Sequence, residues 1–255
     1  MKVLELDISE GIKPFSFVEG YDHYYALIKF QRHPLGWLYF KRTESDVIST
    51  EELEQLIKDR IGYTIVRQML AHSIELKEKN TIQAQAISIV VCTRNRTAYL
   101  ANCLKALMEL EYSNYEIIVV DNAPCNDETQ ELVATLPVRY VREIRPGLDW
   151  ARNRGIAEAK NNIIAFTDDD AVVNKYWLQV ISKAFDNHEV MCVTGFVAPA
   201  ELETGAQRMF ELKYGGMAHG FKQKTFKKKP ANKQATYLGQ QFWCSCKYGL
   251  PQKNI

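Results

Sequence analysis

The stretch IIAFTDDDA, from Ile163 to Ala171, decides the fold. Its first five residues form a short apolar run of the kind expected for a strand that is buried on both faces of a parallel sheet. Three aspartates follow immediately at the end of this run. Two earlier segments have the same form, namely ISIVVC followed by TRNR and YEIIVV followed by DN. The pattern predicts several buried strands with polar residues at their carboxyl ends.

Helical segments separate these strands. In the stretch 93–110, Leu100, Cys103, Leu104 and Leu107 recur at helical spacing, and further helices are predicted at 148–160 and 174–185. Asp127 is expected to cap a helix between the second and third strands, with Gln130 three residues on. Additional strands are predicted at 138–143 and 190–197. Strands that alternate with helices imply an α/β fold with a doubly wound, mostly parallel sheet.

The first 70 residues form a small α+β unit of their own. Residues 24–40 are expected to form a hairpin, and Ser49 and Glu52 can form a capping box at the start of a helix. We predict four regions: an accessory unit at 1–70, a linker or helix extension at 71–86, the sheet domain at 87–238, and an aberrant tail at 239–255. The accessory unit contains no pattern that points to chemistry.

Charge and composition exclude several classes of protein. The formal net charge of +1 gives no overall attraction to nucleic acid. The sequence shows neither a signal peptide nor an apolar run long enough to span a bilayer. Cys92 and Cys192 are expected to be buried thiols. A cytoplasmic protein is expected, and the lysines between Lys222 and Lys233 leave open a peripheral position at the inner membrane face.

The three aspartates at the end of the strand repel one another and need compensation. A hard divalent cation prefers carboxylate oxygens and often binds one or two of them together with substrate phosphates. We therefore expect Mg²⁺ or Mn²⁺ at Asp170 and Asp168, with Asp168 and Asp169 also facing the nucleotide sugar. Of Asp168 and Asp170, one is expected to face the metal and the other the sugar or ribose. The plainer alternative is a solvated acidic turn that caps the next helix.

Polar residues at the other strand ends suit a nucleotide. The segment Thr93-Arg94-Asn95-Arg96 precedes a helix and offers backbone N–H groups and guanidinium groups to an anion or a base edge. Asp121 and Asn122 can accept a base N–H, although Asp-Asn is also common in turns. Arg152 lies near a helix start and can reach a phosphate or form a surface ion pair. Neither a dinucleotide fingerprint nor a P-loop is present.

Together these segments resemble the family 2 glycosyltransferases, which have the GT-A nucleotide-diphospho-sugar-binding fold. The matching text is ISIVVCTRNR, YEIIVVDNAPCND, RPGLDWARNRGIAEAKNNIIAFTDDDAVV, Trp177-Leu178 and VTGFVAP. The resemblance implies transfer of a sugar from a nucleotide-diphosphate donor to an acceptor hydroxyl, mostly with inversion. It further implies that Thr93 and Arg94 lie near the nucleotide, that Asp121 reads the base, and that Arg152 and Asn153 line the phosphate and ribose. Asp170 would bind the metal.

The end of the chain departs from this family. Inverting transfer needs a general base, which the family supplies late in the chain, and no Asp or Glu follows Glu211 here. Glu201 and Glu203 are the other substitutes. Codons for WCSCKYGLPQKN, read one base forward, permit Gly-Ala-Ala-Ala-Asn-Met-Ala-Phe-Arg-Lys, which resembles the family's next segment. We therefore expect a frameshift just before Trp243, with the base and the acceptor half of the site missing.

Three other functions compete with this interpretation. An inactive nucleotide-sugar-binding remnant fits the same residues as an impaired transferase. A nucleotidyltransferase would need a glycine-rich loop after the first strand, and TRNRTAYL has no glycine. A haloacid-dehalogenase-like phosphatase would carry its aspartates at the end of the first strand rather than the fourth. The sequence does not name the sugar, the base or the acceptor, which could be a glycan, a lipid or a small molecule.

Overall fold

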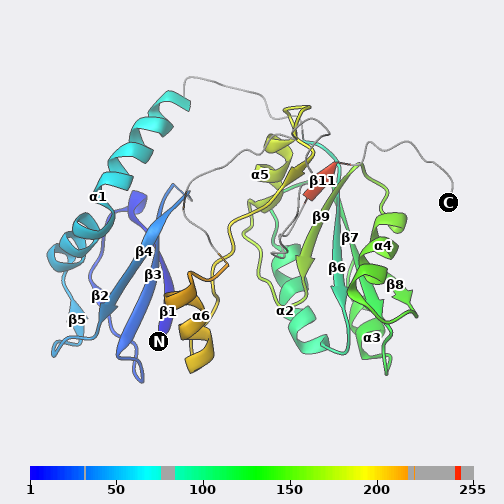
Figure 1. The fold of residues 1–255 in the computed structure, drawn as a ribbon, viewed down its shortest axis with the longest axis horizontal. Coiled ribbons are helices and arrows are strands. Elements are labelled where there is room, and N and C mark those ends of the chain that lie inside the picture. Colours follow the sequence, from blue (N-terminus) through cyan, green and yellow to red (C-terminus); the bar gives the residue numbers. More distant parts are fainter. Residues whose placement is uncertain (32, 76–83, 218–220, 222–244, 248–255) are drawn as a thin grey trace, which may run out of the picture. The chain divides into compact units, whose positions relative to one another are not determined.

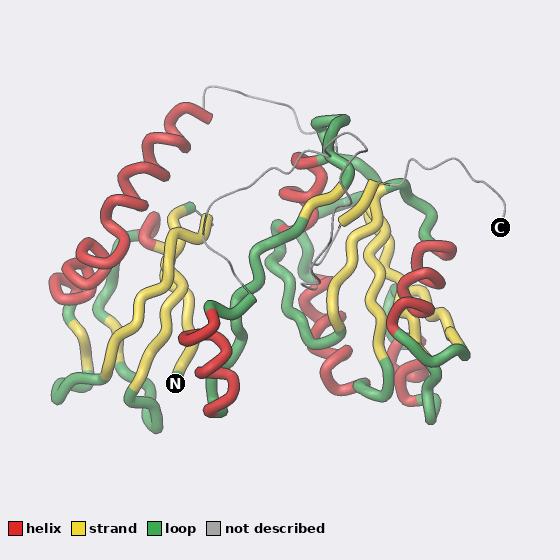
Figure 2. Tube along the Cα trace, in the orientation of Figure 1, coloured by secondary structure: helices red, strands yellow, loops and turns green. Residues whose placement is uncertain are grey.

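The computed structural model describes residues 1–31, 33–75, 84–217, 221 and 245–247. These residues form two compact units, one of residues 1–80 and 196–236 and the other of residues 81–195 and 237–255. Figure 1 labels the helices and strands of both units, and Figure 2 colours them by type. The first unit therefore includes a segment that follows the sheet domain in the sequence.

The first unit contains a three-stranded sheet in the order β1-β3-β4, with β1 parallel to β3 and β3 antiparallel to β4. A two-stranded sheet pairs β2 with β5. Its elements are β1 (Lys2–Asp7), η1 (Ile8–Glu10), β2 (Phe15–Ser16), β3 (His23–Phe30), β4 (His33–Lys41), β5 (Val47–Ile48), α1 (Thr50–Glu75) and α6 (Gly205–Tyr214). The predicted hairpin is confirmed as the pair β3–β4.

The core of the first unit forms where α1 covers β4. Leu53, Ile57 and Ile61 of α1 are buried against strand residues that include Tyr24 and Phe40. The capping box is confirmed, because the amide of Glu52 donates to Oγ of Ser49 over 3.2 Å and the amide of Ser49 donates to the Glu52 carboxylate over 2.9 Å. The helix continues to Glu75, into the stretch for which a linker or a helix extension was predicted.

The second unit contains the mostly parallel sheet, and residues 196–236, which were expected in the same domain as this sheet, belong to the first unit. The sheet of the second unit has the order β10-β11-β9-β6-β7-β8, and the four strands from β9 to β8 are all parallel. The elements are β6 (Ile87–Thr93), α2 (Thr97–Met108), β7 (Tyr115–Asn122), α3 (Glu128–Ala134), β8 (Arg139–Glu143), α4 (Leu148–Glu158), β9 (Ile163–Asp168), α5 (Trp177–Ala184), β10 (Cys192–Val193) and β11 (Ser245–Lys247).

Alternating residues of the strands fill two separate cores, which is why the runs are apolar throughout. Ile89 of β6 lies in the core that α2, α3 and α5 share, whereas its neighbour Val90 lies in the core covered by α4. Helices therefore cover both faces, and the doubly wound fold is confirmed (Figure 1). Gly155 lets α4 approach closely, since a Cβ atom there would lie 2.3 Å from Cγ1 of Val90.

Several details differ from the predictions. The strand expected at 190–197 is reduced to Cys192–Val193, which pairs with the three-residue strand β11. Cys192 is exposed and disulfide-bonded, so the prediction of a buried thiol is wrong there, and Cys92 is half-buried. Asp127 precedes α3, but its side chain makes no capping hydrogen bond, because its backbone, at φ −102° and ψ 8°, lacks the extended conformation of an N-cap residue. Its carboxylate lies 3.5 Å from Nη1 of Arg142.

Two predictions fall largely outside the described residues. The lysine-rich stretch from Lys222 to Lys233 lies there, and so does the predicted tail, apart from the backbone of Ser245–Lys247, which pairs with β9. Within the described part of the chain, no helix combines the length and the apolar character needed to cross a membrane.

Candidate nucleotide-sugar site

The carboxyl ends of four adjacent parallel strands meet at one edge of the sheet. Thr93 ends β6, Asn122 ends β7, Glu143 ends β8 and Asp168 ends β9. The register places Cys92 beside Asp168 and Thr93 beside Asp121. In open α/β sheets this edge is where ligands bind. The backbone therefore brings the predicted polar clusters to one edge of the sheet, as the sequence predicts.

One cluster joins the end of β6 to the aspartates after β9. Oγ1 of Thr93 donates to Oδ2 of Asp169 over 2.7 Å. The guanidinium of Arg96 donates to Oδ1 of Asp169 over 2.9 Å and to Oδ2 of Asp170 over 2.8 Å. Asp169 is buried, whereas nearly half of the Asp170 side chain is exposed. The three aspartates thus occupy different environments, with Asp169 turned inward.

The charges in this cluster oppose ionisation of Asp168. Burial, followed by the neighbouring carboxylates of Asp170 and Asp169, raises the pKa of Asp168 to about 6. Arg152 and Arg96 act in the opposite direction. Burial also raises the pKa of Asp169, against the hydrogen bond from Thr93. Extra positive charge at this edge would therefore be favoured electrostatically.

A second cluster surrounds Asp121 at the end of β7. The residue is fully buried, and its Oδ2 accepts a 3.0 Å hydrogen bond from the hydroxyl of Tyr140 on β8. Its Oδ1 is buried without a hydrogen-bond partner. Burial accordingly raises the pKa of Asp121. A buried acceptor without a hydrogen bond destabilises the folded protein, so Oδ1 of Asp121 is the atom at this edge that would gain most from a donor on a ligand.

Asn122 and Asn95 hold loops in place. Oδ1 of Asn122 accepts from the amide of Gly147 over 2.8 Å, and its Nδ2 donates to the carbonyl of Arg145 over 2.7 Å. Oδ1 of Asn95 accepts from the amide of Cys125 over 3.0 Å, with Asn95 itself at a φ of 54°. Both side chains therefore position the loops beside the edge through bonds within the protein.

The remaining predicted residues lie on the loop after β6 and on α4. Arg94 and Asn153 are exposed. Arg152 lies 3.9 Å from the Asp149 carboxylate and close enough to Asp168 to affect its pKa. Glu201, Glu203 and Glu211, named as substitute bases, belong to the first unit. There Glu203 accepts from the Tyr21 hydroxyl over 2.9 Å, and burial raises the pKa of Glu211.

Sequence reasoning missed two contributors to this edge. Tyr140 orients Asp121, and Glu143 accepts three hydrogen bonds from Arg145, which lower the pKa of Glu143 to about 2. The guanidinium of Arg145 also lies 4.0 Å above the ring of Trp150. The contact between Tyr140 and Asp121 could not be inferred, because the register of β8 against β7 is not visible in the sequence. Glu143 and Arg145 lie two residues apart, so their opposite charges at this spacing are the local signal that could have indicated their pairing.

The described residues include no group of three or more His, Cys, Asp or Glu side chains gathered around a possible metal position. A cation here would thus rest on one or two carboxylates plus ligand oxygens, a donor set that Mg²⁺ commonly uses. The oxygen-only chemistry of Asp168 and Asp170, and the raised pKa of Asp168, fit such an ion.

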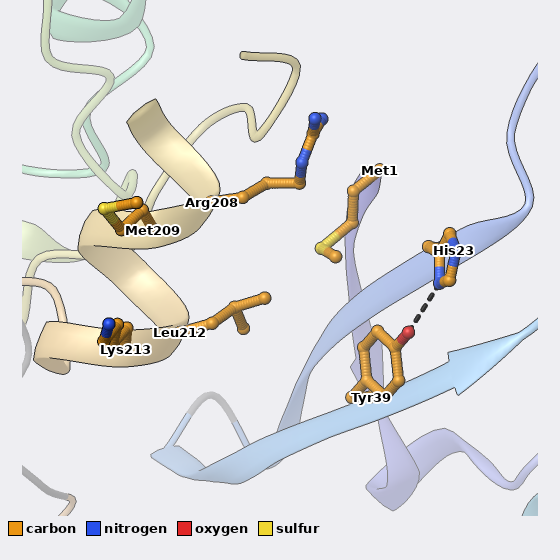
Figure 3. Close-up of a pocket in the computed structure, with 7 residues that line it drawn as sticks. All are labelled: Met1, His23, Tyr39, Arg208, Met209, Leu212 and Lys213. Carbon is orange, nitrogen blue, oxygen red and sulfur yellow. Dashed lines mark hydrogen bonds between the residues drawn. The ribbon is translucent and has the colours of Figure 1, made fainter. Parts of the chain in front are cut away.

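A cavity in the first unit is lined by none of these residues. In the first unit, a cavity of about 560 Å³ is lined by Met1, His23, Tyr39, Arg208, Met209, Leu212 and Lys213. Figure 3 shows Leu212 of α6 facing Met1 and Tyr39, with Tyr39 hydrogen-bonded to His23. None of the predicted nucleotide-sugar residues contributes to it.

The second unit is thus a doubly wound α/β domain with a carboxylate-rich edge. Residues 88–245, more than half of the chain, match the family Glycosyl transferase family 2, and the chain belongs to this family.

Several curated proteins are similar to part of the chain. Glycosyltransferase AglE of Haloferax volcanii is 30% identical over 101 residues, covering 36% of this chain and 33% of that protein. Glycosyltransferase GlyG of Streptococcus pneumoniae is 27% identical, covering 44% and 39%. The chain spans about a third of the length of the curated relatives it matches.

Solved structures are similar over about half of the chain. TarS of S. aureus, as residues 1–349, has a TM-score of 0.43 at 21% identity and covers 50% of this chain and 40% of that one. A mannosyltransferase from Pyrobaculum calidifontis, in complex with GDP-Man and Mn²⁺, has a TM-score of 0.41 at 21% identity, covering 52% and 43%. Both scores lie below 0.5, so the likeness is partial.

Proposed function

We propose that the chain is the donor-binding part of a glycosyltransferase, and that the edge formed by β9, β6 and β7 binds a nucleoside-diphosphate sugar. Family membership supports the class of reaction. The single observation that carries the choice of ligand is the buried, unpaired Oδ1 of Asp121, an acceptor that an N–H group of a base would satisfy. Because Asp121 is fully buried, the base must displace the residues that cover it.

The diphosphate would lie beside the aspartates, where Arg152 supplies positive charge next to Asp168. Asp170 and Asp168 would hold Mg²⁺ or Mn²⁺ together with phosphate oxygens, and the ion would neutralise the charge that develops on the diphosphate as it leaves. Asp169 keeps its place through Thr93 and Arg96. Arg94 and Asn153, both exposed, would contribute to the nucleotide and ribose sides.

The acceptor side supports no comparable assignment among the described residues. Inverting transfer needs a carboxylate at the acceptor hydroxyl, and we assign that role to none of Glu201, Glu203 and Glu211. A second candidate function follows, in which the chain binds a nucleotide sugar without transferring it. Incubation with UDP- and GDP-sugars separates the two, because only a transferase releases the free nucleoside diphosphate.

The proposal is tested by thermal-shift measurements with UDP, GDP and ADP, each with Mn²⁺, with Mg²⁺ and without metal. We expect at least one diphosphate to raise the melting temperature, more with metal than without. Asp170→Ala should abolish the additional shift due to metal, whereas Glu189→Ala, at an exposed residue of the same unit, should retain it. No shift with any diphosphate would contradict the proposal.

A further inference from the structure

Arg96 connects two of the three aspartates. Its Nη1 lies 2.9 Å from Oδ1 of Asp169 and its Nη2 lies 2.8 Å from Oδ2 of Asp170. One guanidinium thus bridges a buried carboxylate and an exposed one. The Cζ atom of Arg96 lies 4.7 Å from the centre of the Tyr99 ring, which limits where the side chain can lie.

The hydrogen bonds from Arg96 to Asp169 and to Asp170 differ in their exposure to water. Asp169 is 4% exposed and uses both oxygens, one towards Thr93 and one towards Arg96. Its bond to Arg96 is therefore sheltered from water. Asp170 is exposed, so its bond to Arg96 is screened and easily exchanged. Of the two contacts, the one with Asp170 is the weaker.

A divalent cation on Asp170 would meet Arg96 directly. Two positive groups that share one exposed carboxylate repel each other, and the doubly charged ion binds the oxygens more strongly. We propose that Arg96 is the counter-ion of Asp170 until a divalent cation binds, and that the cation then displaces Arg96 from Asp170. This inference rests on the proposed metal site. Arg96 keeps its bond to Asp169 and so stays beside the edge.

Competition between Arg96 and the metal predicts how metal affinity responds to substitution. Arg96→Gln removes the competing charge, so Mn²⁺ should bind more tightly without nucleotide. An exposed ion pair of this kind corresponds to roughly a two- to fivefold change in Kd. The electron paramagnetic resonance signal of free Mn²⁺ measures this Kd independently of any reaction.

Two matched variants control the measurement. Arg154→Gln removes the same charge from α4, where Arg154 pairs with Glu158, and should leave the Kd for Mn²⁺ within about 1.5-fold of wild type. Asp170→Asn should weaken Mn²⁺ binding strongly. If Arg96→Gln does not fold, Arg96→Lys serves instead. Its compact ammonium cannot reproduce the two-pronged bridge, so it should also bind Mn²⁺ more tightly than wild type.

The outcomes distinguish the inference about Arg96 from the proposed metal site. If Asp170→Asn loses Mn²⁺ but the folded Arg96 variant binds it no more tightly than wild type, the inference on Arg96 is wrong and the metal site stands. If neither wild type nor the Arg96 variant binds Mn²⁺, the proposed metal site fails together with the inference. Tighter binding by the Arg96 variant alone, with Arg154→Gln unchanged, supports displacement.

Discussion

The hydroxyl of Thr93 donates a 2.7 Å hydrogen bond to the carboxylate of Asp169, a residue 76 positions further along the chain. Thr93 ends β6, and Asp169 follows the last residue of the neighbouring strand β9. This bond holds the central aspartate inward, and Asp168 and Asp170 are the two aspartates at which we propose that a cation binds. The contribution of this bond to stability can be measured directly.

Replacing Thr93 with valine should destabilise the second unit. The substitution keeps the shape of the side chain but removes the donor to a buried carboxylate, and hydrogen bonds to charged groups contribute about 1.5–3 kcal/mol. Urea unfolding measures the loss. Thr97→Val is the matched control, because its hydroxyl contacts the neutral hydroxyl of Thr129 at 3.2 Å and should cost only about 0.5–1.5 kcal/mol. Equal losses in the free energy of unfolding for the two variants would contradict a charge-assisted hydrogen bond from Thr93 to Asp169.

Gly155→Ala should also destabilise the protein. The added Cβ would lie 2.3 Å from Cγ1 of Val90 and 3.3 Å from Cγ2 of Val120, both in buried strands. Overpacking of this kind costs about 1–3 kcal/mol, which exceeds the gain in helix propensity. Gly62→Ala in α1 is the control, since nothing lies within 4 Å of its added Cβ, and it should not destabilise. Thermal unfolding of both variants tests the difference.

The pair of Glu143 and Arg145 should make stability depend on pH. The hydrogen bonds from Arg145 hold the pKa of Glu143 at about 2, below its ordinary value, so the ionised carboxylate favours the folded state. That stabilisation is complete above the unfolded pKa of about 4.3 and is lost as the pH falls towards 2. Glu143→Gln should therefore lower the free energy of unfolding at pH 7 and progressively less between pH 5 and 2.

Urea titrations of both proteins across this range measure the pH effect on Glu143. Glu189→Gln, which removes an exposed carboxylate, serves as the control for the loss of one charge. A deficit for Glu143→Gln that stays constant down to pH 2 would show that Arg145 does not stabilise the ionised form.

Asp121→Asn should stabilise the folded protein and weaken nucleotide binding. Burial raises the pKa of Asp121, so its ionised form opposes folding, and this cost disappears as the pH falls. The neutral amide should therefore raise the free energy of unfolding at pH 8, with a smaller gain at pH 4. The same variant should bind the preferred nucleoside diphosphate about tenfold more weakly, since an acceptor is lost. Calorimetry and urea unfolding provide the two readouts, and unchanged affinity would remove Asp121 from the proposed site.

Local patterns predicted most of the regular structure. The runs around Ile89, Ile118 and Ile164 became central parallel strands, and the apolar face of Leu100 and Leu104 became buried in α2. Predictions failed at individual side chains. Asp127 makes no capping hydrogen bond to α3, and Cys192 is exposed and disulfide-bonded rather than a buried thiol. Neither the backbone angles of one residue nor the bonding of one cysteine can be inferred from spacing alone.

The amino-acid sequence by itself determined the doubly wound fold and the edge at which polar residues gather, because strand burial and helix periodicity are local properties. Only the tertiary structure decided which of those residues contact one another. Strand register brings Tyr140 to Oδ2 of Asp121 and leaves Oδ1 of Asp121 without a hydrogen bond. Because β6 packs beside β9, Thr93 and Arg96 form hydrogen bonds with Asp169. Such pairings depend on distances across the sheet, which a linear sequence does not contain.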